Sequence, residues 1–332
     1  MRTLLGLLLV LLCVSAPAQA AGKLARVDVA LGDVSINKVP FLVAADNGIY
    51  TKNGLDVHQY ITAEAAAAVR ASGVHVPNEY VNKDVAEAPV SIGGGDPMIA
   101  GMARNPNAPL RVIVSTTETI FRSHLIAAPS VDSFTDLKGK RIGTASAGSV
   151  PHYGMIQFAK RMGWEVGRDI IVLPGTENFE SLKAGKVDAI TGSALISAMA
   201  PEAGYKDLGN FAQFNIPVAG SGVMFEAKWL ASNRDIGLRF LKATLEATAL
   251  MQKNQKVFGA AMAKWFNVRD PKVRARMYPQ VREFPKKPYP LIEGIEGAVE
   301  LFSPRGLKAE DFYDASLMAE LDKSGFIDGL YR

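Results

Sequence analysis

Apolar positions recur along the first part of the chain in two alternating patterns. Residues 25–32 and 54–62 are short and β-rich, as strands are, whereas residues 40–48 and 63–73 repeat their apolar positions at helical spacing. The alternation continues with a strand inside 87–97, a helix over 98–104 and a strand over 110–118. This order predicts βαβ units and a mostly parallel sheet.

A second α/β block follows a segment rich in turn-forming residues, 128–140. Its expected strands are 141–146, 169–174 and 187–192, and its expected helices are 150–163, 179–186 and 193–204. The longest helical pattern, 235–254, has an apolar stripe that we expect to be buried, made by Leu238, Leu241, Leu245 and Ala249. The remainder is helical with proline-rich joints such as 284–290. The pattern therefore predicts two α/β blocks and a helical C-terminal part.

The N-terminus has the pattern of a secretory signal peptide. Arg2 precedes an apolar run over residues 4–14, and Ala18-Gln19-Ala20 supplies the small residues of a cleavage site. We expect residues 1–20 to be removed near Ala20 and the chain to be exported, because the run is too short for a membrane anchor. A lipoprotein signal needs a small residue before its cysteine, and Leu12 stands there, so lipidation of Cys13 is not expected.

Composition excludes several kinds of site. Cys13 is the only cysteine, so the mature chain is expected to have neither disulfides nor a thiolate metal site. His58 and His75 have no partner at metal-ligand spacing, and no metal site is expected. The chain has 37 basic and 33 acidic residues without a long run of either sign, a pattern that gives no indication of nucleic-acid binding. The mildly basic balance fits small anions.

Four turns between an expected strand and the following helix have the same character. They are rich in small residues with hydroxyl or amide groups, and they span 35–38, 91–96, 144–149 and 191–193. Helix N-termini leave N–H groups without intrahelical partners, and the carboxyl ends of parallel strands lie along one edge of a sheet. Each turn alone could be no more than a helix cap. Their repetition favours a shared ligand-binding cleft.

These turns and the adjoining residues supply the candidate ligand contacts. They are Asn37, Lys38, Phe41, Gly94, Asp96, Thr116, Ser146, Gly148, Ser149, His152, Thr191 and Ser193. Asp96 is expected to cap its own helix, so the turn over 146–149, which has hydroxyls and no carboxylate, is the better anion site. Phe41 either flanks the ligand or belongs to the core, and His152 is expected to be a wall residue.

Several motifs together resemble one family. They are "VPFLVAADNGIYTKNGLDV" from Val39, "DLKGKRIGTASAGSVPHYGM" from Asp136, "LKAGKVDAITG" from Leu182 and "DFYDASLMAEL" from Asp311. In this order they resemble the nitrate/sulfonate/taurine/thiamine-precursor family of periplasmic substrate-binding proteins of ABC transporters. Two stretches depart from the family pattern: residues 73–89 form a longer link than usual, and 191–193 replace the usual aromatic-Asp-Pro. Both touch the expected ligand site, so the ligand's identity does not carry over.

The resemblance implies an α/β, two-lobe type II (Venus-flytrap) fold with mostly parallel sheets. Lobe one is expected over 24–120 plus 223–332 and lobe two over 121–222, with Arg122 and His124 near one crossing. The implied protein is a periplasmic monomer without cofactor or catalysis. It captures a small anionic or polar organic molecule between its lobes, closes on it, and delivers it to an ABC permease with its ATPase.

Two other functions compete with transport. A secreted serine hydrolase could use Ser149 or Ser146, with His152 or the distant His124 as base, although Gly-x-Ser-x-Gly is not met. The phosphate-binding motifs Gly-Lys-Ser/Thr and Gly-x-Gly-x-x-Gly are also not found in the sequence. A solute sensor with the same fold is the second alternative.

Overall fold

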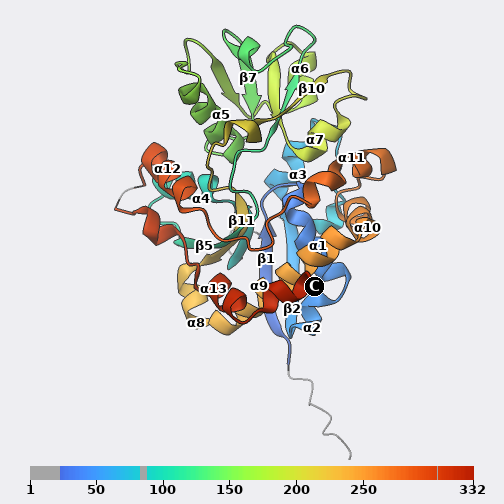
Figure 1. Ribbon diagram of the computed structural model, residues 1–332, viewed down its shortest axis with the longest axis vertical. Coiled ribbons are helices and arrows are strands. Elements are labelled where there is room, and N and C mark those ends of the chain that lie inside the picture. Colours follow the sequence, from blue (N-terminus) through green and yellow to red (C-terminus); the bar gives the residue numbers. More distant parts are fainter. Residues whose placement is uncertain (1–22, 83–87, 305) are drawn as a thin grey trace, which may run out of the picture.

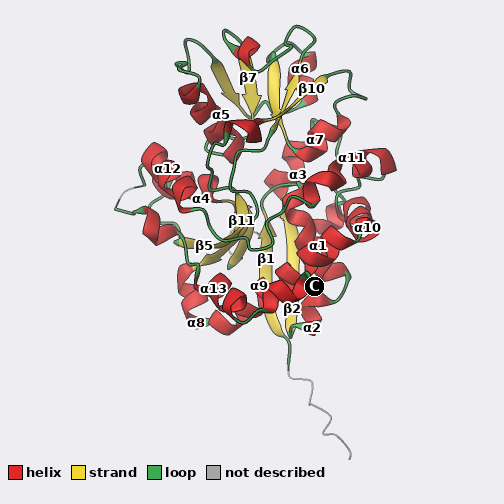
Figure 2. Ribbon diagram, in the orientation of Figure 1, coloured by secondary structure: helices red, strands yellow, loops and turns green. Residues whose placement is uncertain are grey.

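The computed structural model describes residues 23–82, 88–304 and 306–332. The expected signal peptide, residues 1–20, lies outside the described residues. The described chain forms two β-sheets, and we call each sheet with its helices a lobe (Figures 1 and 2).

Lobe one contains a six-stranded sheet with the order β3-β2-β1-β4-β11-β5. Its strands are β1 Ala25–Leu31, β2 Leu55–Thr62, β3 Val81–Asn82, β4 Val90–Gly94, β5 Arg111–Thr116 and β11 Ser221–Glu226. Its helices are α1 Val39–Asp46, α2 Ile49–Lys52, α3 Ala63–Arg70, α4 Gly95–Arg104, α8 Ala227–Ser232, α9 Arg234–Lys253, α10 Gln255–Trp265, α11 Pro271–Val281, α12 Ile292–Phe302, α13 Ser316–Lys323 and α14 Phe326–Leu330.

Lobe two contains a five-stranded sheet with the order β10-β6-β9-β7-β8. Its strands are β6 His124–Ala127, β7 Arg141–Thr144, β8 Ile171–Pro174, β9 Ala189–Gly192 and β10 Lys206–Asn210. Its helices are α5 Val150–Arg161, α6 Phe179–Lys183 and α7 Ala194–Met199. In Figure 1 this lobe lies above lobe one.

Five of the nine strand pairs in the described chain are parallel and four are antiparallel. The antiparallel pairs arise because β11 and β6 run against the other described strands of their sheets. Each of these strands follows a crossing between the lobes. The strand before each crossing, β5 or β10, ends at the edge of its sheet that faces the other lobe. The chain therefore enters the second sheet at the edge that faces the first lobe, and the next strand, β6 or β11, runs away from that edge. The predicted α/β class with mostly parallel sheets is confirmed.

The crossing segments pair with each other between the lobes. Phe121 N–H donates to the Ile216 carbonyl at 2.8 Å, and Val218 N–H donates to the Thr119 carbonyl at 3.1 Å. The expected second lobe boundary, 222/223, falls inside β11, whose pairing with β4 begins at Ser221. The two crossings thus form a short two-stranded link.

Aromatic packing joins the helices α1, α2 and α9 of lobe one. Phe41 and Tyr50 both stack on Phe240 of α9. The centroid of the Phe240 ring lies 6.1 Å from that of Phe41 and 5.5 Å from that of Tyr50. Leu241, Leu245 and Ala249 of the stripe expected in α9 are buried, whereas Leu238 is only half-buried. The core also takes in Phe240, Ala243 and Ala247, so the buried face is wider than the expected stripe.

The structure corrects one helix start. Asp96 was expected to cap a helix over 98–104, but α4 begins at Gly95 with Gly94 as its N-cap. Asp96 is fully buried, and its carboxylate accepts the Ala219 N–H at 3.1 Å. It therefore ties α4 to the crossing that precedes β11. Burial raises the pKa of this carboxyl well above its ordinary range.

Candidate ligand-binding site

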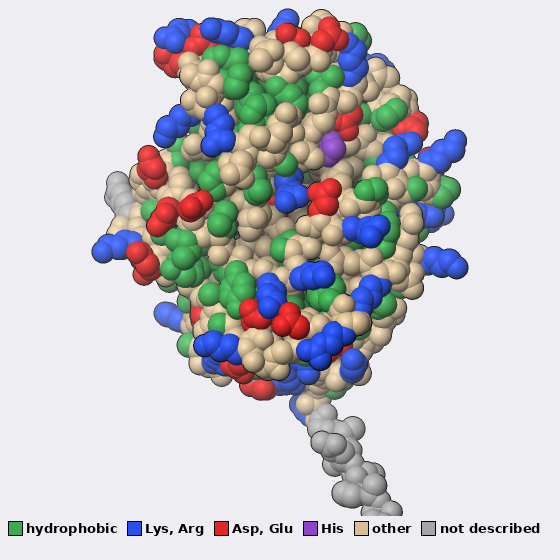
Figure 3. Space-filling model, viewed as in Figure 1, with side chains coloured by type: hydrophobic (Ala, Val, Ile, Leu, Met, Phe, Trp, Pro, Cys, Tyr) green, Lys and Arg blue, Asp and Glu red, His purple; other side chains and the backbone are tan. Residues whose placement is uncertain are grey.

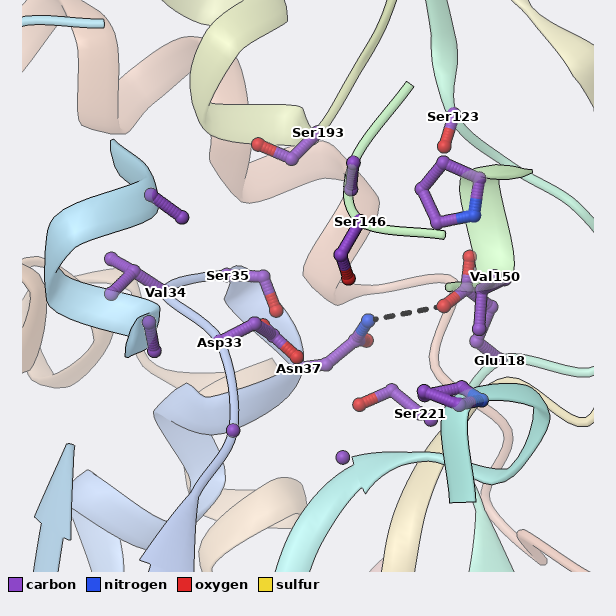
Figure 4. Close-up of a pocket in the computed structure, with 18 of the residues that line it drawn as sticks. Asp33, Val34, Ser35, Asn37, Glu118, Ser123, Ser146, Val150, Ser193 and Ser221 are labelled. Atoms are coloured by element: carbon purple, nitrogen blue, oxygen red, sulfur yellow. Dashed lines mark hydrogen bonds between the residues drawn. The ribbon is translucent and has the colours of Figure 1, made fainter. Parts of the chain in front are cut away.

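A cavity of about 850 Å³ lies between the two lobes. Its walls come from the edges at which the two sheets face each other: Asp33 follows β1, Glu118 follows β5, and Ser146 follows β7. Figure 4 shows Ser146 and Ser193 of lobe two across the cavity from Asp33 and Ser221. A volume of this size suits a small organic molecule.

The lobe-one wall is built around a buried lysine. Lys38 is fully buried, and its ammonium pairs with Asp33 and donates to Ser221 Oγ at 2.8 Å. Asn37 Nδ2 points to Glu118 Oε2 at 3.5 Å, the contact drawn in Figure 4. The turn after β1 is thereby fixed to β11 and to the crossing after β5.

The lobe-two wall contains a carboxylate held by neutral donors. Glu177 accepts the Ala145 N–H at 3.1 Å and the Thr191 hydroxyl at 2.9 Å. Ser193 is the N-cap of α7 and accepts the Ile196 N–H at 3.4 Å. Glu177 thus occupies the strand ends at which a ligand carboxylate would find its donors.

Two of the cavity's carboxyl groups have raised pKa values. Burial raises the pKa of Glu118 to about 6; Asp33 adds to the effect, and the neighbouring cations Lys38 and Arg122 oppose it. Burial raises the pKa of Glu177 to about 8, opposed by its two hydrogen bonds and reinforced by the charges of Asp33 and Glu118. Carboxylates from both lobes therefore face the same space.

Four of the expected contact residues line the cavity: Asn37, Gly94, Ser146 and Ser193. Five others support its walls from buried positions, namely Lys38, Asp96, Thr116, Ser149 and Thr191. Phe41 packs against Phe240 in the core. Gly148 and His152 lie beside the cavity. Gly148 is in the turn before α5, and His152 is in the first turn of α5.

The residues that sequence reasoning missed are mainly acidic. Asp33, Glu118 and Glu177 line the cavity, as do Ser221 and Asn178. Asp33 and Glu118 each lie two residues beyond a strand end, in turns that the sequence pattern places at the facing edge of the sheet, and this position could have identified them. Glu177 lies three residues beyond β8, in a turn that was not among the four candidate turns.

The 146–149 turn is already occupied by internal hydrogen bonds. Ser149 caps α5 and accepts the His152 N–H at 3.3 Å. Gly148 N–H donates to His152 Nδ1 at 3.2 Å, so this ring nitrogen accepts from the backbone instead of from the serine hydroxyl. His124 lies between Asp207, at 2.9 Å, and Gln280, at 3.1 Å. This arrangement supplies neither candidate serine with a base.

The lobes touch on both sides of the cavity. Arg104 of α4 donates to the Ala147 carbonyl at 3.3 Å, and a Cβ added to Gly148 would lie 2.8 Å from the Ala100 Cβ. On the other side Arg276 of α11 donates to the Ala198 carbonyl of α7 at 2.8 Å. Arg122 pairs with Glu283 at 2.9 Å beside the crossing. The described conformation is therefore closed around the cavity.

No described helix is both long enough and apolar enough to cross a membrane. Within the same residues, no group of three or more His, Cys, Asp or Glu side chains is arranged to hold a metal ion.

Fold and cavity together define a two-lobe periplasmic binding-protein fold, and known structures share it. The periplasmic aliphatic sulphonate binding protein SsuA from Escherichia coli has a TM-score of 0.65 and 16% identity, covering 87% of this chain and 92% of that chain. The periplasmic nitrate-binding protein NrtA from Synechocystis PCC 6803 has a TM-score of 0.67 and 12% identity, and the match covers 91% of this chain and 89% of that chain. The desulfurization enzyme DSZB has a TM-score of 0.61 and 12% identity, covering 90% and 98%.

The family model described as NMT1/THI5 like matches residues 35–257, more than half of the chain. The chain belongs to this NMT1/THI5-like family, and the family resemblance expected from the sequence is confirmed. A search of curated protein sequences gives no significant match.

Proposed function

We propose that this protein is the periplasmic solute-binding component of an ABC importer. It captures a small organic molecule in the cavity between its lobes, closes on it, and delivers it to a permease driven by an ATPase. The observation that carries the proposal is the cavity of about 850 Å³, whose walls are the facing turns of both sheets.

Closure provides the mechanism. A ligand can favour the closed state only through contacts that the open state lacks, and moving the population from 1:99 to 99:1 takes about 5.5 kcal/mol. Asp33 and Asn37 on one wall and Ser146 and Glu177 on the other reach a single ligand together only when the lobes are closed. Binding and closure are thereby coupled.

The internal hydrogen bonds of Ser149 and His152 support binding without catalysis. In this proposal the hydroxyls near the cavity position the ligand and cap helices, and no covalent intermediate forms.

Mass spectrometry of gently purified, native protein tests the proposal by identifying retained small molecules. Thermal-shift measurements with nitrate, ethanesulfonate, acetate, 4-aminopyrimidine and butylamine provide the second test. A ligand at one hundred times its Kd adds about 2.7 kcal/mol to the free energy of unfolding. The proposal fails if no molecule is retained and none of these compounds stabilises the protein.

A further inference from the structure

The cavity contains more negative than positive side chains. Its lining includes the acidic residues Asp33, Glu64, Glu118, Glu177 and Glu283, and the basic residues Arg111 and Arg122. Charges of both signs are interspersed over the face seen in Figure 3. The acidic lining is therefore a property of the cavity and not a continuation of an acidic face.

The positive charges near the cavity already have partners. Arg122 pairs with Glu283 at 2.9 Å, and the buried Lys38 pairs with Asp33. Arg111 donates to the backbone carbonyls that precede β4, at Ala88 and Pro89. Lys38 and Arg122 are thus paired with carboxylates, and the Arg111 guanidinium is held by backbone carbonyls.

Glu118 and Glu177 lack such a partner. Among the ion pairs of the described chain, none includes either carboxylate. Their hydrogen-bond donors are neutral: the Asn37 amide for Glu118, and the Ala145 N–H and Thr191 hydroxyl for Glu177. In their ionised forms these two carboxylates, which come from opposite lobes, repel each other, and this repulsion adds to the burial that raises the pKa of Glu177.

Buried polar atoms on the same wall point to a ligand independently of charge. Asp33 Oδ1 and Ser35 Oγ are inaccessible to solvent and have no hydrogen-bond partner among the described residues. Both residues line the cavity. Buried polar atoms without partners cost free energy, which a ligand with N–H donors would recover at this wall.

The turn that the sequence favoured as an anion site already uses three of its backbone donors internally. The N–H groups of Ala145, Gly148 and Ser149 donate to Glu177, His152 and Ser146 respectively. The carboxylate of Glu177 itself occupies this position. An anionic ligand would have to displace it.

We infer that the ligand of this cavity is an organic cation whose ammonium or amidinium group binds between Glu118 and Glu177. The inference rests on the proposed function and specifies its ligand class. Apolar residues around the rest of the space would hold the organic part: Val69, Met98, Met102, Met224 and Phe284. The cation neutralises the two facing carboxylates and so stabilises the closed state.

The inference fixes the sign of the pH dependence. Asp33, Lys38, Asn37 and Arg122 surround Glu118, while Asp33 and Glu118 face Glu177. A bound cation favours the ionised carboxylates, so binding releases protons between pH 6 and 8, the range of the two raised pKa values. Cation affinity therefore rises with pH across this range, whereas anion affinity falls.

The experiment compares organic cations with anions of the same shape. Benzylamine, benzamidine and butylamine are tested against benzoate, benzenesulfonate and butanesulfonate, each at 10 mM, by thermal shift and calorimetry at pH 6 and pH 8. We expect only the cations to raise the melting temperature, with tighter binding at pH 8.

Variants assign the effect to the two carboxylates. Glu118→Gln and Glu177→Gln should each weaken cation binding at least tenfold. The amide oxygen introduced by Glu177→Gln can still accept both hydrogen bonds of the wild-type side chain, so this variant removes the charge and keeps the local structure. Glu180→Gln is the matched control, since Glu180 is an exposed side chain of α6 that does not belong to the cavity lining. It should bind cations as the wild type does.

Three results would overturn the inference: stabilisation by the anions alone, cation binding that survives both Gln substitutions, or no stabilisation by any of the cations. Stabilisation by the anions would leave the proposed function intact. A protein that retains no molecule and responds to no compound of either charge would contradict the proposed function as well.

Discussion

Lys38 organises the floor of the cavity at the scale of single residues. A fully buried ammonium needs partners that compensate for its lost hydration, and Asp33 and Ser221 provide them. Because these partners come from the turn after β1 and from the start of β11, the contact joins segments far apart in the sequence. The cavity wall and the stability of lobe one therefore depend on the same contact.

We expect Lys38→Met to lower the free energy of unfolding by about 2 kcal/mol, because it leaves Asp33 and Ser221 without their donor. Urea denaturation measures the effect. Lys52→Met is the control, since Lys52 is exposed and pairs with Glu246 at the surface; its cost should stay below about 0.5 kcal/mol. Equal costs for the two variants would rule out a structural role for Lys38.

The raised pKa of Glu177, about 8, makes the ligand-free protein less stable in alkali. Below the ordinary pKa of a glutamate, near 4.3, both folded and unfolded chains are protonated at this site and the contribution is complete. This stabilising contribution decreases as the pH rises from about 4.3 to about 8, because in this range the folded chain holds the proton at Glu177 and the unfolded chain does not. The melting temperature should therefore fall between pH 5 and 9.

Glu177→Gln should flatten this decline, with a difference of about 2 kcal/mol at pH 9. Differential scanning calorimetry of both proteins across this range is the measurement. Parallel curves for the wild type and the variant would show that Glu177 is ionised throughout.

At the scale of elements, Gly148 allows α5 to approach α4. It has φ of +82°, and a Cβ at this position would lie 2.8 Å from Ala100. The alanine methyl group in Gly148→Ala should hinder closure and weaken ligand binding about tenfold. Calorimetric titration with a compound that stabilises the wild type measures this change.

Gly163→Ala is the control for backbone strain. Gly163 has φ of +69° with open space around its Cβ position, so both alanines cost about 1 kcal/mol of stability. Only Gly148→Ala should lose affinity. A similar loss of affinity in both variants would show that the contact between α4 and α5 does not control closure.

Local patterns predicted most elements but not the reversed strands. Strands β1, β2, β4 and β7 and helices α1, α3, α5 and α9 lie close to their expected positions, because each has an apolar repeat or a clear stop signal. The direction of β6 and β11 is set by the crossings between the lobes, and β10 pairs with β6 across a long stretch of sequence. A sequence pattern has no access to such long-range contacts.

The candidate site was predicted in outline for a similar reason. Turns rich in serine and glycine identified the facing edges, and Asn37, Gly94, Ser146 and Ser193 line the cavity there. Which side chain points inward depends on tertiary contacts: Lys38 turns into the protein to meet Asp33, while Glu177 reaches the cavity from beyond β8. The acidic character of the cavity therefore emerged only from the folded structure.

At the scale of the whole molecule, two lobes joined by the paired crossings enclose one cavity, and in our proposal the lobes move about this link. Contacts between α4 and α5 and between α7 and α11 close it on both sides. The α7 side is also apolar, because Ala194, Leu195 and Ala198 belong to the same buried cluster as Val273 and Met277 of α11. Opening on this side would expose apolar surface, so in our proposal the ligand contacts add to this packing in favouring the closed state.

The most direct test of this account is the distance between the lobes with and without ligand. The one cysteine, Cys13, precedes the expected mature chain, so Thr51→Cys and Lys183→Cys place one spin label at an exposed position on each lobe. Pulsed electron paramagnetic resonance measures the distance between the labels. With the compound that stabilises the protein most, we predict a shift to one narrow distribution that matches the closed structure. An unchanged distribution in the presence of that compound would contradict the account.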